Sequence, residues 1–159
     1  MRIFRLAREI WLPQPPAEVF RFFADATNLE MLTPPWLGFS ILTPAPIEMR
    51  AGTRIDYRLR LRGIPVRWQS EITVWEPPER FIDEQRRGPY RVWIHEHNFR
   101  PQGAGTLVGD RVQYAVPGGK FINRFLVAPD LIKIFDYRHS ALRQLFGHGH
   151  EGENEALQR

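Results

Sequence analysis

The chain has 159 residues, enough for one domain with its own core, and it is 43% hydrophobic and 25% charged, as globular proteins are. It contains no cysteine, which excludes disulfides, thiolate nucleophiles and cysteine-ligated metal centres. Arginine or glutamate interrupts every apolar run of the N-terminal MRIFRLAREIW, which argues against a signal peptide or membrane span there and predicts a cytoplasmic protein.

The formal net charge of +4 is carried mainly by arginine, because Lys120 and Lys133 are the only lysines. Nucleic-acid binding would need these cations gathered with stacking aromatics on one exposed surface. Residues 54–62 instead alternate arginine with apolar side chains, a pattern typical of a strand with one solvated face and one buried face. We therefore expect no nucleic-acid partner.

The first predicted elements are a strand and two short helices. Residues 3–12 alternate apolar and polar side chains, which predicts a strand. Apolar residues at helical spacing follow in PPAEVFRFF, whose prolines suit the first turn of a helix. Asp25 is a candidate cap for a second short helix, which runs to about Leu32 and must end at TPPW.

A run of strands follows, separated by the turn sequences TPAP, RGIP, EPPE, RRGP and PQGAG. Consecutive strands joined by short turns predict an antiparallel meander. The predicted strands lie near residues 38–43, 53–62, 65–75, 80–87, 90–100 and 105–116.

A long helix is predicted at the end of the domain, where Pro129 suits the first turn and Gly147 the end. It carries an apolar stripe that can cover one face of the sheet. The expected fold is therefore α+β, with a seven-stranded bent antiparallel sheet wrapped around this helix. We assign residues 1–147 to the domain and residues 148–159 to a disordered polar tail. The stripe consists of Leu131, Ile134, Phe135, Leu142, Leu145 and Phe146.

Three segments and the order of the elements carry a family resemblance. PPAEVFRFF opens the first helix, and GTLVGDRVQY precedes the crossing to the final helix. In this order, over roughly residues 2–147, the chain resembles the START-like superfamily, also called SRPBCC or helix-grip proteins. RFIDEQRRGPYRVWIHEHNF and GTLVGDRVQY look most like its bacterial ligand-binding branch related to polyketide cyclases and dehydrases. The resemblance implies a cavity between the sheet and the last helix that holds a hydrophobic or amphipathic molecule.

The inner face of each strand is chosen as the one that carries the bulky residues. In YRVWIHEHNF this choice points Trp93, His95, His97 and Phe99 inward. In the strand near 65–75 the inward residues are Trp68, Ser70, Ile72 and Val74. The residues expected to face solvent are Arg54, Arg58, Arg60, Arg67, Glu71, Arg91, Glu96 and Arg111.

Polar side chains also gather on the predicted concave face. Each buried polar group without a partner costs about 1–3 kcal/mol, so these groups must pair with one another, with water or with a ligand. Arg138, beside the helix stripe, either reaches inward as a polar anchor or forms a surface salt bridge. The candidate ligand-binding residues are Tyr57, Trp68, Asp83, Gln85, Trp93, His95, His97, Phe99, Asp110, Tyr114, Phe135 and Arg138.

Several interpretations of this polar cluster stay open. It can be an internal Asp–His network that sets the register of the core, or one wall of a small-molecule site. In an enzyme, His95 or His97 would act as general acid or base, oriented by Asp110 or Asp83. His95-x-His97 with a carboxylate offers three metal ligands. Neither a third histidine nor a cysteine supports a metal site, so we predict no metal and no cofactor.

Two aromatic loops are candidates for the entrance of the cavity, LTPPWLG and VPGGKFINRFLVAP. The second is either an ordinary crossover, packed under the final helix, or a lid or membrane-contact patch. We expect no stable insertion into a membrane. This segment combines basic and apolar residues, namely Lys120, Phe121, Arg124, Phe125 and Leu126.

The leading hypothesis is a protein that binds a hydrophobic or aromatic small molecule in the cavity. One alternative is a polyketide cyclase- or dehydratase-like enzyme that uses a cavity histidine as general acid or base. A further alternative is an interaction module whose cavity is filled by its own side chains. The oligomeric state, including a homodimer, stays open.

Overall fold

A computed structural model describes residues 1–147 of the chain, so the tail predicted over 148–159 lies outside the described residues. The elements follow the predicted order. They are β1 (Phe4–Leu12), α1 (Pro16–Ala24), the 3-10 helices η1 (Ala26–Leu32) and η2 (Pro35–Leu37), β2 (Ser40–Ile41), β3 (Arg54–Leu61), β4 (Ile64–Glu76), β5 (Arg80–Arg87), β6 (Val92–Gln102), β7 (Gly105–Ala115), α2 (Gly119–Ile122), the π-helical turn η3 (Asn123–Val127) and α3 (Ala128–Phe146).

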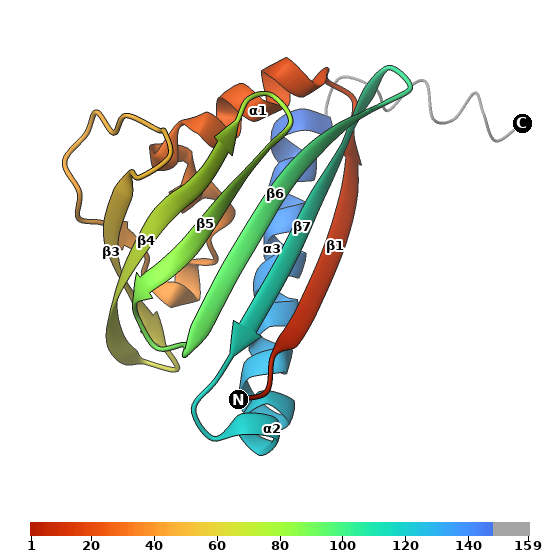
Figure 1. Ribbon diagram of the computed structural model, residues 1–159. Coiled ribbons are helices and arrows are strands. Elements are labelled where there is room, and N and C mark those ends of the chain that lie inside the picture. The colour runs from red at the N-terminus through yellow and green to blue at the C-terminus, as the bar shows by residue number, and fades with distance from the viewer. Residues whose placement is uncertain (148–159) are drawn as a thin grey trace, which may run out of the picture.

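Within residues 1–147 the seven strands form one antiparallel sheet in the order β1-β7-β6-β5-β4-β3-β2. Strands β2 to β7 are the predicted meander, and β1 pairs with β7, with Phe4 opposite Tyr114 and Leu12 opposite Thr106. Figure 1 shows this sheet curving around α3, which runs along its concave side. The predicted helix-grip α+β fold is confirmed.

Local sequence accounts for the two predicted short helices, α1 and η1, and a third, η2, follows them before β2. Pro16 begins α1, and its missing N–H costs no hydrogen bond there, because N–H groups in the first turn of a helix have no partner within the helix. The Asp25 side chain accepts a hydrogen bond from the Thr27 backbone N–H at 3.0 Å, so Asp25 caps η1 as predicted. Pro34 and Pro35 follow, and the chain turns into η2.

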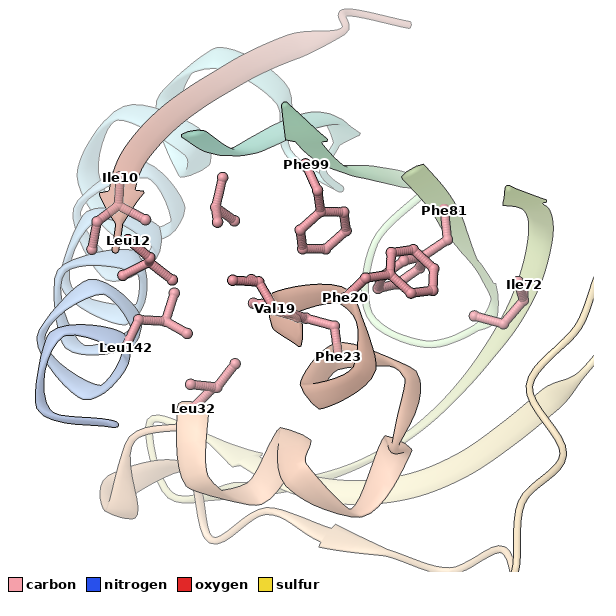
Figure 2. Packing of buried hydrophobic residues seen from close by; sticks show 11 residues of the cluster. Ile10, Leu12, Val19, Phe20, Phe23, Leu32, Ile72, Phe81, Phe99 and Leu142 are labelled. Atoms are coloured by element: carbon pink, nitrogen blue, oxygen red, sulfur yellow. The ribbon is translucent and has the colours of Figure 1, made fainter. Parts of the chain in front are cut away.

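One core cluster closes one end of the space between the sheet and α3. In Figure 2 the α1 side chains Val19, Phe20 and Phe23 point inward between the strands and Leu142 of α3. The Phe20 ring meets Phe99 edge-on, with 5.2 Å between ring centroids. A second cluster, formed by Val112, Tyr114, Val116, Leu131 and Phe135, packs the opposite end of β7 against α3.

The arginines of the sheet lie on its outer face, as predicted. All six arginines predicted there are exposed. Glu71 accepts hydrogen bonds from Arg86 on β5 at 3.0 Å and from Arg54 on β3 at 2.9 Å. These two hydrogen bonds lower the pKa of Glu71. The outer face thus carries a cross-strand network of charges in solvent.

The inward orientation predicted for Val74 is wrong. A β-bulge interrupts the pairing of β4 with β5: Ile72 lies opposite Asp83, Val74 opposite Ile82, and Trp75 opposite Phe81. The extra residue of a bulge reverses which side chains face the core beyond it. The Trp75 ring therefore points inward and contacts Phe20, with 5.2 Å between ring centroids.

No helix within residues 1–147 combines the length and the apolar character needed to cross a lipid bilayer.

Candidate functional site

A cavity of about 210 Å³ lies between the sheet and α3. Members of both core clusters border it, because α1 fills only one end of the space that the sheet encloses. Its wall is mostly apolar, with aliphatic side chains from β3, η1 and α3. The aromatic side chains of the wall include Phe39, Tyr57, Trp68, Tyr90, Trp93 and Phe135.

The structure brings most of the predicted ligand-binding residues to this wall. Those that line the cavity are Tyr57, Trp68, Asp83, Trp93, His95, His97, Phe135 and Arg138. Arg138 reaches inward from α3 and is buried, so it is a polar anchor and not part of a surface salt bridge. The four predicted residues that lie elsewhere are Gln85, Phe99, Asp110 and Tyr114.

Three of these four have structural partners away from the cavity. The Gln85 side chain closes the β5–β6 turn, donating to the Tyr90 carbonyl at 2.7 Å and accepting from the Tyr90 N–H at 3.1 Å. Phe99 belongs to the core cluster around α1. The Tyr114 hydroxyl donates to Asn123 Oδ1 at 2.9 Å, which ties β7 to η3. The prediction that all three side chains face inward was correct. The alternation along a strand cannot show where along the strand the cavity begins.

Asp110 lies directly behind the cavity wall and is 1% exposed. Burial raises the pKa of its carboxyl group, but the Arg138 guanidinium and the neighbouring His139 and His95 rings outweigh burial and hold that pKa well below its usual range. Asp110 is therefore ionised and acts only as an acceptor. His95 Nε2 lies 2.7 Å from Asp110 Oδ1 and must carry the proton of this bond. The Nδ1 edge of His95 is left on the cavity side, 3.9 Å from Asp83 Oδ2.

His97 has both ring nitrogens engaged. Arg138 Nη2 lies 3.2 Å from His97 Nδ1, and because a guanidinium only donates, Nδ1 accepts this bond. His97 Nε2 therefore carries the proton and donates to Asp83 Oδ2 at 2.7 Å. Burial, helped by the nearby His95, lowers the pKa of His97 to about 4 despite the Asp83 carboxylate. At neutral pH His97 is thus a neutral imidazole of fixed tautomer, stacked on the Phe81 ring at 4.1 Å between centroids.

Two acidic residues line the cavity, Asp25, which caps η1, and Asp83, which belongs to the histidine cluster. Burial raises the pKa of Asp83, but the hydrogen bond from His97 and the nearby His95 ring and Arg138 guanidinium outweigh burial, so the net shift is downward. The His95 and His97 rings stack beside it, with 3.7 Å between centroids. Arg138 Nη2 also lies 3.3 Å from Asp110 Oδ1, so the buried guanidinium contacts both Asp110 and His97. This cluster is a paired network, not a set of isolated buried charges.

A second polar group on the wall consists of three residues from β3 and β4. Ser70 Oγ accepts from Trp68 Nε1 at 3.0 Å and lies 2.7 Å from the Tyr57 hydroxyl. Burial raises the pKa of Tyr57, so the phenol keeps its proton. Of the two hydroxyl hydrogens, only one is used in the bond between Ser70 and Tyr57. The other is available to a ligand.

The sequence placed Ser70 inward but did not identify it as a site residue, and it missed the contribution of the helices. Phe22, Phe23 and Leu32 of α1 and η1 also line the cavity. Of these three, only Phe23 was at the helical spacing that indicates burial, and that spacing does not distinguish a side chain packed in the core from one beside a void. Tyr90 was missed because the predicted strand, residues 90–100, placed it on the outward face, whereas β6 begins only at Val92.

Asp83, His95 and His97 are the metal-ligating residues that the structure brings together, with one ligand atom from each within 4.8 Å of the others. A cation held by His97 Nε2 would displace the proton that Nε2 donates to Asp83. The proton would then have to sit on Nδ1, where it meets the N–H of Arg138. The guanidinium also adds a positive charge beside the site. The geometry therefore favours the hydrogen-bonded network over a cation.

The sheet wrapped around a long helix, with a cavity between them, defines a protein of the helix-grip class. Residues 12–129 match the family model described as polyketide cyclase/dehydrase and lipid transport. That match spans most of the chain, so the chain belongs to this family.

Solved structures with the same fold come from bacteria and plants. The ZhuI aromatase/cyclase from Streptomyces sp. R1128 shares 13% identity, with 93% of this chain and 99% of that chain covered and a TM-score of 0.71. Protein TTHA0849 from Thermus thermophilus shares 24% identity, with 89% and 95% covered and a TM-score of 0.66. Ginseng major latex-like protein 151 from Panax ginseng shares 10% identity, with 91% and 97% covered and a TM-score of 0.65. No curated protein matches the chain by sequence.

Proposed function

We propose that the protein binds a hydrophobic or aromatic small molecule in the cavity between the sheet and α3. The observation that carries this proposal is a void with an aromatic and aliphatic wall and polar groups on one side. Small-molecule sites usually enclose about 300–1,000 Å³, so a cavity of about 210 Å³ suits a compact ligand. The membership of the chain in a polyketide cyclase/dehydrase and lipid transport family supports the same reading.

The polar groups define how such a ligand would be oriented. Asp83 is ionised and accepts hydrogen bonds, so it favours a ligand with a hydroxyl or amine donor. The remaining hydrogen of the Tyr57–Ser70 pair favours an acceptor such as a carbonyl or ether oxygen at the other polar position. The rings of Trp68 and Trp93 meet edge-on, with 5.4 Å between centroids, and supply flat surfaces for an aromatic ligand.

A small phenol should therefore bind. With 2-naphthol as the probe, we expect quenching of the fluorescence of Trp68 and Trp93 and a Kd on the order of 10–100 µM. Leu59→Trp, which extends an indole ring into the cavity, should weaken binding at least about tenfold. Ile64→Trp adds the same ring on the solvent side of the β3–β4 hairpin and should leave the Kd unchanged. Equal binding by all three proteins would argue against the cavity as the site.

Native mass spectrometry of protein purified gently from its host is the complementary measurement. A compound that co-purifies with the unaltered protein but not with the Leu59→Trp variant would identify the natural ligand class. A third reading, an interaction module with a filled interior, requires that no small molecule enter. The open volume beside Asp83 does not favour that reading.

A second candidate function is proton-transfer catalysis, and the geometry of His95 favours it. Asp110 holds the Nε2 proton of this ring, so the Nδ1 edge faces the cavity with a buried carboxylate to stabilise an imidazolium. In a cyclisation, a base removes a proton from the carbon between two carbonyl groups, and that carbon bonds to another carbonyl carbon. The new alkoxide takes up the proton, and elimination of the hydroxyl with a neighbouring hydrogen releases water. A base at His95 Nδ1 suits the first of these steps.

If this second function is correct, a poly-β-ketone substrate should be cyclised, and His95→Gln should lower kcat by about 100-fold or more. Ile64→Gln is the control, because Ile64 is 66% exposed on the β3–β4 turn and does not line the cavity. Product formation is followed by chromatography and mass spectrometry. Binding of the probe without any turnover by the unaltered protein would leave ligand carriage as the function.

A further inference from the structure

The helical segment before α3 exposes large apolar side chains. Phe121 is 75% exposed and Phe125 64%, and Ile122 and Leu126 beside them are also exposed. We define these four residues with Lys120 and Arg124 as the α2–η3 patch. None of the six lines the cavity, so neither the fold nor the proposed ligand site explains them.

The orientation of this segment is fixed by contacts on its opposite side. Asn123 accepts a hydrogen bond from the Tyr114 hydroxyl and so faces the sheet. Residues two positions away on a helix point to the other side, which places Phe121 and Phe125 outward. Gly118 and Gly119 have φ angles of +84° and +60°, which turn the chain so that α2 projects beyond the end of the sheet. Figure 1 shows α2 at this end, next to the N-terminus.

The patch and the chain leading into it carry only positive charges, and the next carboxylate along the chain, Asp130, is paired with Arg62. Residues 111–129 contain Arg111, Lys120 and Arg124 and no aspartate or glutamate. The guanidinium of Arg124 lies over the Phe125 ring, 5.5 Å from its centroid. Arg2 lies at the same end of the sheet, because β1 begins opposite the end of β7. Exposed aromatics bordered by cations are the combination that binds an anionic lipid surface.

We propose that the α2–η3 patch docks the protein reversibly on an anionic lipid membrane. The two phenylalanines would enter the interface between headgroups and acyl chains, and Lys120 and Arg124 would contact lipid headgroups. A second copy of the chain fits less well, because a symmetric contact through this patch brings Lys120 and Arg124 against their own copies. Two aromatics and two cations give a weak contact, in keeping with a helix that does not span the bilayer.

Flotation with vesicles tests the proposal on the full chain. We expect binding to phosphatidylcholine vesicles that contain phosphatidylserine as the minor component, and at least about tenfold less binding to phosphatidylcholine alone. Added salt should weaken the binding. Phe121→Ser with Phe125→Ser should lower binding at least about tenfold, and Lys120→Gln with Arg124→Gln should remove the preference for phosphatidylserine.

Ile64→Ser is the matched control, since Ile64 is 66% exposed on the β3–β4 turn, outside the patch. It should bind vesicles as the unaltered protein does. All the altered side chains are exposed, so thermal melts should coincide and a folding defect would be visible. No binding to the phosphatidylserine vesicles, or equal binding by the double phenylalanine variant, would overturn the proposal. Self-association of the unaltered protein that is lost only in the double phenylalanine variant would also overturn the proposal.

Discussion

Replacing Asp110 with alanine should lower the free energy of unfolding by about 3–5 kcal/mol. Asp110 is 1% exposed and is the carboxylate nearest the buried Arg138, whose Nη2 lies 3.3 Å away. Without Asp110 the guanidinium keeps its charge at a site where Arg138 is only 6% exposed, and the His95 Nε2–H loses its acceptor. Denaturation in urea, followed by tryptophan fluorescence, measures the loss.

Asp136→Ala is the matched control for this prediction. Asp136 also pairs with an arginine, Arg8, but its side chain is 58% exposed, and surface pairs contribute about 0–1 kcal/mol. A second variant tests the mechanism. Asp110→Leu combined with Arg138→Met removes both charges and should be more stable than Asp110→Ala. Equal losses for Asp110→Ala and Asp136→Ala would mean that Arg138 is not stabilised by Asp110.

The sequence predicted the fold because its signals are local and repeat along the chain. Proline and glycine mark the turns between strands, and the alternation of arginine with apolar residues in β3 identifies the outer face of the sheet. The exception is β4. A bulge adds one residue to one strand, and it leaves no mark in the alternation until the partner strand is known, so Val74 was pointed inward in place of Trp75.

The sequence predicted which polar residues face inward at the candidate site, but not how deep each of them lies. The alternation of side chains along each strand correctly predicted that four polar residues face the same side of the sheet. They are Asp83, His95, His97 and Asp110. The alternation gave no information on depth, which depends on how the sheet curves around α3. Asp110 therefore lies behind the cavity wall, where it holds His95, while Asp83 faces the cavity. Which nitrogen of the His97 ring carries the proton follows from the position of Arg138, a residue that comes from α3.

The same limit applies to the α2–η3 patch. Its basic and apolar composition can be read from the sequence, but a crossover packed under the final helix and an exposed one have the same composition. The structure separates them through the bond from Tyr114 to Asn123, which turns Phe121 and Phe125 away from the sheet. A single long-range contact thus determines whether the apolar side chains of this segment are buried or exposed.

Acid should destabilise the fold well above the range in which carboxylates titrate. The ordinary pKa of His97 is 6.5, and burial lowers it to about 4 in the folded protein. As the pH falls below 6.5, the unfolded chain takes up a proton at His97 that the folded protein does not, which favours unfolding. The stability conferred by neutral His97 is complete above pH 6.5 and is lost as the pH falls toward 4. The loss should reach roughly 3 kcal/mol.

Urea denaturation at a series of pH values measures this loss, and His97→Gln isolates it. Glutamine cannot titrate, so the variant should be less stable at neutral pH but should show a flatter profile between pH 6.5 and about pH 4. The pKa values of Asp83 and Asp110 are also lowered on folding. Their stabilisation is present above their ordinary pKa of 3.8 and is lost only as the pH falls further, below the window assigned to His97. Parallel profiles for the two proteins would show that His97 is protonated in the folded state, and that the Arg138 N–H does not hold its Nδ1 as an acceptor.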